Sequence, residues 1–434
     1  MTLYDVFSSR SQFSNTYALC LQGARHIRIT EAAPENSLRI TLETFGSPIT
    51  FIPPFERPIV SCQGLSRGAR AMENSSSPAR YEAQTDGGPD STSNASNAGR
   101  NGPTRVASIG KSQQRTLGKT SSLDAVEQEI RNQVEDLPAF ARELGEYDRF
   151  RNLDPSSMIF TGSGDSLASS LFAHYLSQMQ AFAADPFELQ LYPHTAWNKT
   201  IFITSVSGKT RTNIKLAKKV KVVAKKRVAI TANPSSPLAK ECDDLIQIRY
   251  RNPGILTSGT ASFSAALLVA AALIRRLPKL DSLPIMERRA VGWARGLQVH
   301  PRGGFLFVGS GTGYSLAMYA AFKIHEVLGL PAYYQHTEQL GHSQLFPLRK
   351  KSDNLLFLSP SSDKRTGEVF RVLSRSGFHA YLLKSEARDP ILAALQVMFC
   401  VQHLALYLGR KTGLRECAFL TDKKRLALSS RLIY

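Results

Sequence analysis

The sequence predicts an α/β fold built from two similar halves, each a three-layer αβα sandwich around a parallel sheet. Two observations support this prediction. From about residue 158, short apolar segments of strand length alternate with longer helical segments, which is typical of β-α-β units. Near residue 305 the alternation starts again, and "IFTGSGDSLASSLFAHYL" in the first half corresponds to "FVGSGTGYSLAMYAAFKI" in the second. An internal duplication explains both observations.

The composition indicates a mostly globular chain. Its 434 residues, 42% of them hydrophobic, are enough for two or three domains. The five cysteines lack the spacing of a disulfide framework or a zinc site, so a reducing, cytoplasmic setting is expected. The apolar segment 262–274 ends at Arg275 and Arg276, which predicts a buried helix and no membrane span.

The formal net charge of +19 raises the question of a polyanionic partner. Most of this charge is dispersed along the chain. The densest cluster runs from Lys215 to Arg227 and has no interleaved aromatic residues. A solvated helix face is therefore expected there, and nucleic acid is not an expected partner.

Residues 1–120 are interpreted as an N-terminal extension. The first 62 residues contain short alternating stretches, such as "SLRITLETF" and "ITFIPPF", that are compatible with paired strands. From residue 63 the chain is rich in Ser, Asn, Gly and Pro, a composition that cannot bury enough apolar surface to offset the cost of ordering. Most of the extension is therefore predicted to be disordered.

The first structured domain is predicted at residues 121–276. It opens with a helix at 121–144, which Ser122 is expected to cap. Strands are then expected at 158–162, 200–208, 227–233 and 245–250, with helices at 165–183, 210–225, 236–243 and 258–276.

The second domain is predicted at residues 277–434, beginning with a linker at 277–292. Its expected strands are 305–311, 354–362 and 379–385, and its expected helices are 313–328, 365–377 and 389–408. Residues 331–342 fit either a strand or a loop.

Two turns that follow strands carry the first functional signal: "TGSGDS" at 161–166 and "SVSGKT" at 205–210. Glycines let a backbone approach an anion, and hydroxyls and helix N-terminal amides donate hydrogen bonds to it. Either turn alone is more simply a capped strand-to-helix connection. Both are expected at the carboxyl edge of one sheet, so together they predict a site for a phosphate group on a small molecule. Neither matches a nucleotide-binding motif.

The second signal is the stretch 322–342, which contains Lys323, Glu326 and His342. Tyr319, Lys323 and Glu326 recur on one helix face, opposite an apolar stripe, so this pair of charges is expected to point away from the core. A simpler interpretation is a surface ion pair worth at most about 0.5 kcal/mol and a loop histidine. The two phosphate turns favour the functional interpretation.

The motifs "GSGDS", "SVSGKT" and "VGSGTGYSLAMYAAFKIHEV" resemble the sugar isomerase (SIS) domain family. The similarity is to the isomerase half of glucosamine-6-phosphate synthase and to archaeal phosphoglucose/phosphomannose isomerases, and it covers about residues 121–434. Two SIS subdomains are therefore implied. The resemblance also implies that the substrate phosphate is held by hydroxyl side chains of the two turns, namely Ser163, Ser166, Ser205, Ser207 and Thr210.

The resemblance further implies a sugar-phosphate isomerase, an intramolecular oxidoreductase that interconverts the aldose and ketose forms of a hexose 6-phosphate. Glu326 resembles the base that moves a proton between C1 and C2, and His342 resembles the group that opens the sugar ring. Lys323 would orient Glu326 or stabilise the enediolate. Because the family histidine often comes from a neighbouring subunit, a homodimer with shared active sites is implied. No metal or organic cofactor is required.

Three alternatives remain open. The same fold supports amino-sugar phosphate deaminases and fructosamine-phosphate deglycases, although Leu428 or Ser429 stands where the synthase carries a catalytic lysine. A third alternative is a non-catalytic regulator that senses a phosphorylated sugar. Such a sensor would need only the phosphate turns, so the glutamate and histidine favour an enzyme.

Overall fold

The structure is a computed structural model that describes the backbone of residues 26–32, 37–44 and 47–51, and residues 120–145, 150, 152–360 and 363–434. The chain divides into two compact units, Met1–Ala107 and Ser108–Tyr434. In the first unit, an antiparallel sheet has the order β1-β2-β3, with β1 at His26–Ala32, β2 at Ser37–Thr44 and β3 at Ser47–Phe51. The predicted disordered stretch, 63–120, lies outside the described residues except for residue 120.

The first half of the second unit contains a five-stranded parallel sheet in the order β5-β4-β6-β7-β8. All residues of β4 and β6 are buried because helices cover both faces of the sheet, which explains why their central residues are consecutive apolar side chains without polar alternation. The strands are β4 (Met158–Gly162), β5 (Phe182–Ala184), β6 (Thr200–Thr204), β7 (Lys226–Thr231) and β8 (Asp244–Gln247).

Helices cover the two faces of this sheet in separate apolar clusters. On the outer face, Leu189, Leu216 and Leu238 pack from α4 (Pro186–Leu191), α5 (Arg211–Lys219) and α6 (Pro237–Glu241). On the inner face lie α3 (Asp165–Leu176), α2 (Ser122–Glu143) and α7 (Thr260–Ile274). The lysines of α5 and its following turn remain exposed, as expected, whereas Arg227 is buried in β7 against Asp243.

The second half repeats this arrangement. Its parallel sheet has the order β10-β9-β11-β12, which matches β5-β4-β6-β7 strand for strand. Its strands are β9 (Phe305–Gly309), β10 (Ala332–His336), β11 (Asn354–Ser359) and β12 (His379–Lys384). The helix α10 (Lys364–Arg375) covers the outer face and α9 (Thr312–Leu328) the inner face. The predicted α/β fold with two αβα halves is confirmed.

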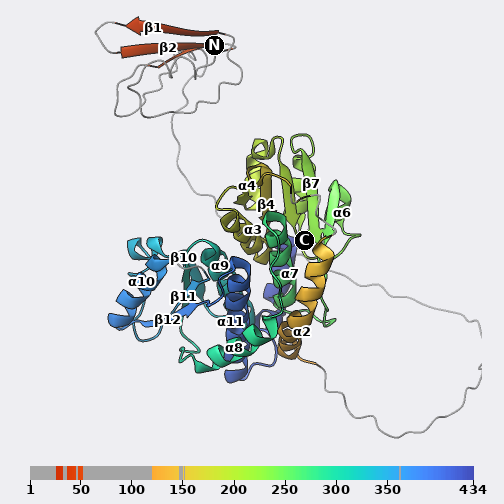
Figure 1. The fold of residues 1–434 in the computed structure, drawn as a ribbon, viewed down its shortest axis with the longest axis vertical. Coiled ribbons are helices and arrows are strands. Elements are labelled where there is room, and N and C mark those ends of the chain that lie inside the picture. The colour runs from red at the N-terminus through yellow and green to blue at the C-terminus, as the bar shows by residue number, and fades with distance from the viewer. Residues whose placement is uncertain are drawn as a thin grey trace, which may run out of the picture. The chain divides into compact units, whose positions relative to one another are not determined.

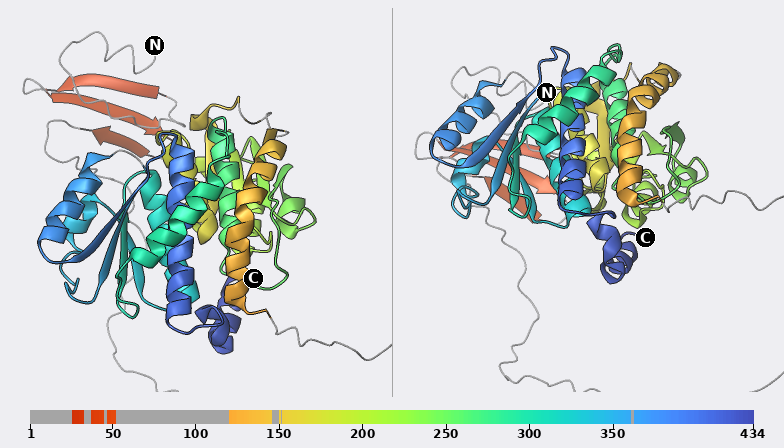
Figure 2. Two further views of the ribbon diagram at one scale, coloured as in Figure 1. Left: turned by 60° about the horizontal axis from the view of Figure 1, so that its bottom comes forward. Right: turned by 90° about the horizontal axis from the view of Figure 1, so that it is seen from below.

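A layer of helices lies between the two sheets, as Figure 1 shows. It includes α7, α9, α8 (Leu283–Gly296) and α11 (Pro390–Lys411). Figure 2 shows α8, α11 and α2 running alongside one another in this layer. Among the described helices, α11 is the one that is long and apolar enough to cross a membrane, and 83% of its most apolar window is buried within the protein.

The shorter elements connect these layers or end the chain. They are η2 (Pro155–Ser157), η3 (Pro193–Ala196), η4 (Glu338–His342), α12 (Ala418–Thr421) and α13 (Lys423–Ile433).

Three expectations about local structure were wrong. The expected linker at 277–292 is largely the helix α8, whose buried residues Met286 and Ala290 pack in the central layer. Ser121, not Ser122, caps α2: its Oγ accepts a hydrogen bond from Asp124, while the Ser122 hydroxyl accepts one from the Cys417 backbone. The helix expected to reach residue 183 ends at Leu176, and β5 follows it.

Candidate active site

The two predicted phosphate turns lie side by side at the carboxyl edge of the first sheet. They follow β4 and β6, which are adjacent strands, and Gly162 pairs with Thr204 where these strands end. A Cβ atom on Gly162 would lie 2.8 Å from the Thr204 carbonyl oxygen, so only glycine permits this close approach. Gly164 then starts α3 with a φ of 60°, a conformation that also favours glycine.

Hydroxyl groups line the second turn. Ser205 is buried, and its Oγ lies 3.1 Å from the Oγ1 of Thr210, the residue that precedes α5. The hydroxyl of Ser207 accepts a hydrogen bond of 3.2 Å from the backbone N–H of Lys209. The structure therefore gathers these three predicted residues in one turn at the N-terminus of a helix, where an anion is stabilised.

Asn213 connects the two turns. Its side chain is fully buried, its Nδ2 donates to the Thr204 carbonyl at 2.9 Å, and its Oδ1 accepts from the exposed Ser163 hydroxyl at 3.3 Å. Ser166 lies one turn further along, buried at the start of α3. All five hydroxyl residues predicted to hold phosphate thus lie in two adjoining turns.

Lys323 of α9 is the centre of a charged cluster beside the first turn. Its side chain is 1% exposed, and its ammonium donates to three acceptors: Asp165 Oδ2 at 2.8 Å, Glu326 Oε2 and the backbone carbonyl of Ser258. An ammonium has three N–H donors, so these contacts use all of them. Asp165 belongs to the first turn, and the cluster therefore holds Glu326 next to that turn.

The expectation that Lys323 points away from the core was wrong. The helix α9 packs between the two halves, so Lys323 and Tyr319 are buried along with the apolar stripe. The Lys323 ammonium lies 5.1 Å from the centre of the Tyr319 ring, which in turn stacks on Phe263 at 3.6 Å. Lys323 is consequently a buried cation whose partner Glu326 stays partly exposed, and the two do not form a solvated surface pair.

Burial changes the protonation of these groups. Desolvation, assisted by the negative charge of Asp165, raises the pKa of Glu326 to about 7, although Lys323 opposes the change. Desolvation also raises the pKa of Asp165. Burial alone would lower the pKa of Lys323, but the two carboxylates together raise it. Glu326 retains 36% of its side-chain exposure, so a carboxylate that titrates near neutrality faces solvent.

A buried polar network fixes the other side of Tyr319. Gln402 of α11 donates to the Tyr319 hydroxyl at 3.1 Å and accepts from Gln133 of α2 at 3.0 Å. Ser264 of α7 donates to Gln133. Side chains from three other helices therefore set the position of the Tyr319 ring, which lies against Lys323.

His342 is not brought to Glu326 within one chain. It is exposed at the end of η4, whose Leu340 packs in the apolar cluster on the outer face of the second sheet, beneath α10. Glu326 lies on the opposite, inner side, near the C-terminus of α9. The structure thus separates His342 from the other predicted catalytic residues.

Asp165 and Asn213 are the site residues that the sequence prediction missed. Asp165 lies inside a predicted phosphate turn. A carboxylate among hydroxyl groups that are expected to bind an anion is unusual, and this was the signal that could have identified it. Asn213 carried no comparable signal, because its role depends on a contact with Ser163, which lies 50 positions earlier in the chain.

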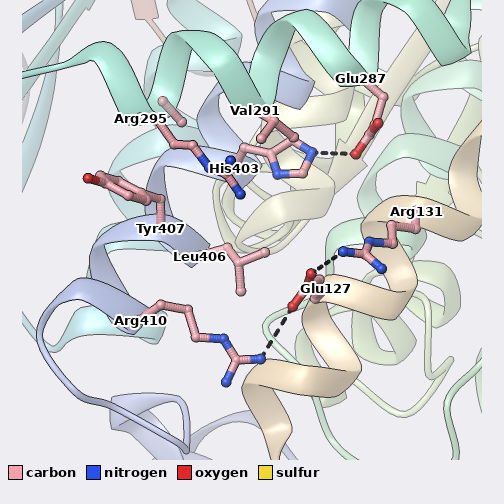
Figure 3. Close-up of a pocket in the computed structure, with 10 residues that line it drawn as sticks. Glu127, Arg131, Glu287, Val291, Arg295, His403, Leu406, Tyr407 and Arg410 are labelled. Atoms are coloured by element: carbon pink, nitrogen blue, oxygen red, sulfur yellow. Dashed lines mark hydrogen bonds and ion pairs between the residues drawn. The ribbon is translucent and has the colours of Figure 1, made fainter.

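A cavity of about 510 Å³ lies elsewhere, between α2, α8 and α11 (Figure 3). Within it, His403 contacts Glu287 at 2.9 Å, and Glu127 pairs with both Arg131 and Arg410. None of its ten lining residues belongs to the two turns or to α9, so this cavity is separate from the candidate site. In the part of the chain that the structure describes, no group of three His, Cys, Asp or Glu residues is placed to hold a metal ion.

Comparisons with known proteins agree with this architecture. Residues 154–276 match the family model of the SIS domain, which confirms the resemblance expected from the motifs. No curated protein sequence matches the chain.

Solved structures with a similar fold include three proteins that differ in their named activity. A glucosamine-6-phosphate deaminase from Thermotoga maritima has a TM-score of 0.57 at 17% identity, covering 67% of this chain and 96% of its own. The C-terminal domain of glucosamine-fructose-6-phosphate aminotransferase from Francisella tularensis gives 0.56 at 15%, covering 69% and 98%. A tagatose-6-phosphate ketose/aldose isomerase from Escherichia coli gives 0.54 at 17%, covering 67% and 93%. At these identities the likeness shows the shared fold.

Proposed function

Proceeding from a SIS domain at residues 154–276, we propose that this protein is a sugar-phosphate isomerase that interconverts the aldose and ketose forms of a hexose 6-phosphate. The observation that carries the proposal is the position of Glu326. Its carboxylate is partly exposed, has a pKa of about 7, and is tied through Lys323 to the first phosphate turn. A base that titrates near the working pH suits proton transfer between carbon atoms.

In the proposed reaction the turns after β4 and β6 bind the phosphate and Glu326 acts on the opened sugar. Glu326 takes the proton from C2 of the aldose while the C1 carbonyl oxygen takes a proton from water, which gives an enediol. Glu326 then returns its proton to C1, and the C2 hydroxyl gives its proton to water as it becomes a carbonyl. Because the three N–H groups of Lys323 are already bonded, Lys323 orients Glu326 instead of contacting the enediolate.

Ring opening is assigned to His342 of a second copy of the chain in a homodimer. Two facts support this assignment: His342 is exposed, and it lies on the outer side of the second sheet, away from Glu326 of its own chain. A mixture of Glu326→Gln and His342→Ala chains tests it. Random pairing restores one intact site in half of the dimers, so about a quarter of the wild-type activity should return. Activity that stays at the level of the single variants would reject shared sites.

The central experiment offers fructose 6-phosphate, mannose 6-phosphate and glucosamine 6-phosphate to the purified protein in ²H₂O and follows the products by NMR. We expect interconversion of a ketose and an aldose, with deuterium appearing at C1 or C2. The Glu326→Gln variant should show neither the interconversion nor the deuterium incorporation. Ammonia release from glucosamine 6-phosphate would instead identify a deaminase. Binding without turnover of any of the three sugars would identify a sensor.

A further inference from the structure

The contacts of Asp165 raise a question that the proposed function does not answer. Asp165 is the first residue of α3, where an acidic side chain is favoured by the helix dipole alone. Yet its Oδ2 lies 2.8 Å from the Lys323 ammonium, and its Oδ1 is buried with no hydrogen-bond partner among the described residues. A carboxylate that serves only to start a helix would not need a buried cation.

The charges of the cluster do not balance. One ammonium stands between two carboxylates, so the cluster carries a net negative charge when both acids are ionised. Both carboxylates are partly withdrawn from solvent, where an uncompensated negative charge is unfavourable, and one bound proton removes that charge. The cluster is thus built to hold a single proton between Asp165 and Glu326.

The other groups that face the cluster do not supply a positive charge to balance it. Tyr319 on α9 and Cys417 before α12 are both neutral near pH 7, because burial raises the pKa of each, that of Cys417 to about 11. Ser258, before α7, contributes its carbonyl. Glu129 of α2 faces the same loop, but Thr257 and Thr260 bind its carboxylate.

We infer that Asp165 is a positioning residue that shares the Lys323 ammonium with Glu326, so that the two carboxylates hold one proton as a unit and Asp165 decides when Glu326 is ionised. The catalytic meaning of this inference rests on the proposed function, but the shared proton does not. Asp165 competes for the ammonium and repels a negative charge on Glu326. Removing the charge of Asp165 should therefore make Glu326 a stronger acid.

The test measures the ionisation of Glu326 directly in the full chain. Glutamate labelled with ¹³C at its carboxyl carbon is incorporated, and the Glu326 signal is identified by its absence in Glu326→Gln. In the wild type its titration midpoint should lie near pH 7. In Asp165→Asn we expect a midpoint lower by about one pH unit or more, since a like charge is lost and the ammonium turns to Glu326.

The control is Asp363→Asn, which removes a carboxylate that starts α10 in the second half and contacts neither Lys323 nor Glu326. It should leave the midpoint unchanged. If Asp165→Asn fails to fold, Asp165→Thr replaces it, because Thr312 starts α9 in the same way. A midpoint in the folded variant within about 0.2 pH units of the wild type would overturn the inference.

Activity separates this inference from the proposed function. If the enzyme turns over a hexose phosphate, the acid limb of kcat should move with the NMR midpoint while KM stays within about twofold. A shifted midpoint without turnover of any sugar phosphate would reject the isomerase and retain the shared proton. Turnover with an unshifted midpoint would support the isomerase and reject the shared proton.

Discussion

The helices α3 and α9 begin with the same backbone conformation, but the two ends of the pair that they form differ in chemistry. Gly164 and Gly311 precede these helices with nearly equal angles, φ 60° and ψ −127° against φ 55° and ψ −130°. The helices are antiparallel, since Asp165 contacts Lys323 at one end and Tyr175 contacts Tyr314 at the other. One end holds three charged groups, and the other holds stacked rings.

Residues at equal distances from Gly164 and Gly311 show which side chains differ between the two helices. Leu176 in α3 occupies the place of Lys323 in α9, and Thr312 occupies the place of Asp165. At the aromatic end, Tyr314 stacks on His336 at 3.5 Å. Duplication therefore preserved the turn that starts each helix, while substitutions at matching positions placed the ammonium and the two carboxylates at one end only. The predictions below test this contrast, from the largest expected effect to the smallest.

Glu326→Gln should reduce kcat by about a thousandfold, because a neutral amide cannot accept the C2 proton. Steady-state kinetics with the best hexose phosphate measures it, and KM should change little because Glu326 does not bind phosphate. Glu386→Gln, which removes an exposed carboxylate paired with Arg289, is the control and should retain activity. A kcat within tenfold of the wild type would show that the charged end does not supply the base.

Lys323→Leu introduces the residue found at the matching position of α3, Leu176. It should lower the free energy of unfolding by about 3 kcal/mol at pH 7, since it leaves two partly buried carboxylates without their cation. The loss should be smaller at pH 5, where these carboxylates are more readily protonated. Urea denaturation measures both. The double variant Asp165→Thr/Lys323→Leu, a copy of the aromatic end, should recover part of the loss. A change under about 1 kcal/mol for the single variant would contradict the buried ion cluster.

Ser205→Ala should raise KM about tenfold and leave kcat within about threefold, because it removes one hydrogen bond to a charged phosphate. Its matched control is Ser315→Ala, which removes a buried hydroxyl from α9 in the second half, where it donates to the Thr312 carbonyl. Equal KM values for both variants would mean that the turn after β6 does not bind the substrate.

Stability should fall as the pH rises from about 5 to about 7. A carboxyl group whose pKa is raised by folding binds its proton more tightly in the folded state, so its stabilising effect is complete at low pH and lost as the pH passes its folded pKa. Since Glu326 is partly exposed, we expect a loss of roughly 1 kcal/mol after allowing for solvent screening. Urea denaturation across this range should show the fall in the wild type. A fall of the same size in Glu326→Gln would assign it to other groups.

Tyr314→Phe, at the aromatic end, should change kcat and KM by less than about twofold and the free energy of unfolding by about 0.5 kcal/mol, because the ring that stacks on His336 is retained. Kinetics and urea denaturation of the same preparation provide the test. A tenfold loss of kcat would contradict the contrast between the charged and aromatic ends, since it would show that the aromatic end takes part in the reaction.

The order of strands and helices was predictable because apolar strands buried on both faces differ in length and composition from the helices between them. The helix α8 escaped prediction because its buried face relies on alanines such as Ala290 and Ala294, between charged residues, after Pro284. Alanine is a weak hydrophobic signal, and proline in a first helical turn reads like a break.

The two phosphate turns were predictable because glycine and hydroxyl residues follow strands at fixed positions. The orientation of Lys323 was not predictable, because the periodicity of α9 does not reveal that α3 of the first half packs on its polar side. The link from Asp165 to Lys323 joins residues 158 positions apart, so it depends on the packing of α3 against α9 and not on any local pattern.

The saturation of the Lys323 ammonium limits the covalent chemistry open to this site. An amine must lose its proton before it can attack a carbonyl carbon and form an imine, and the two carboxylates that raise the pKa of Lys323 oppose that loss. Borohydride added during turnover should therefore leave no sugar attached to Lys323.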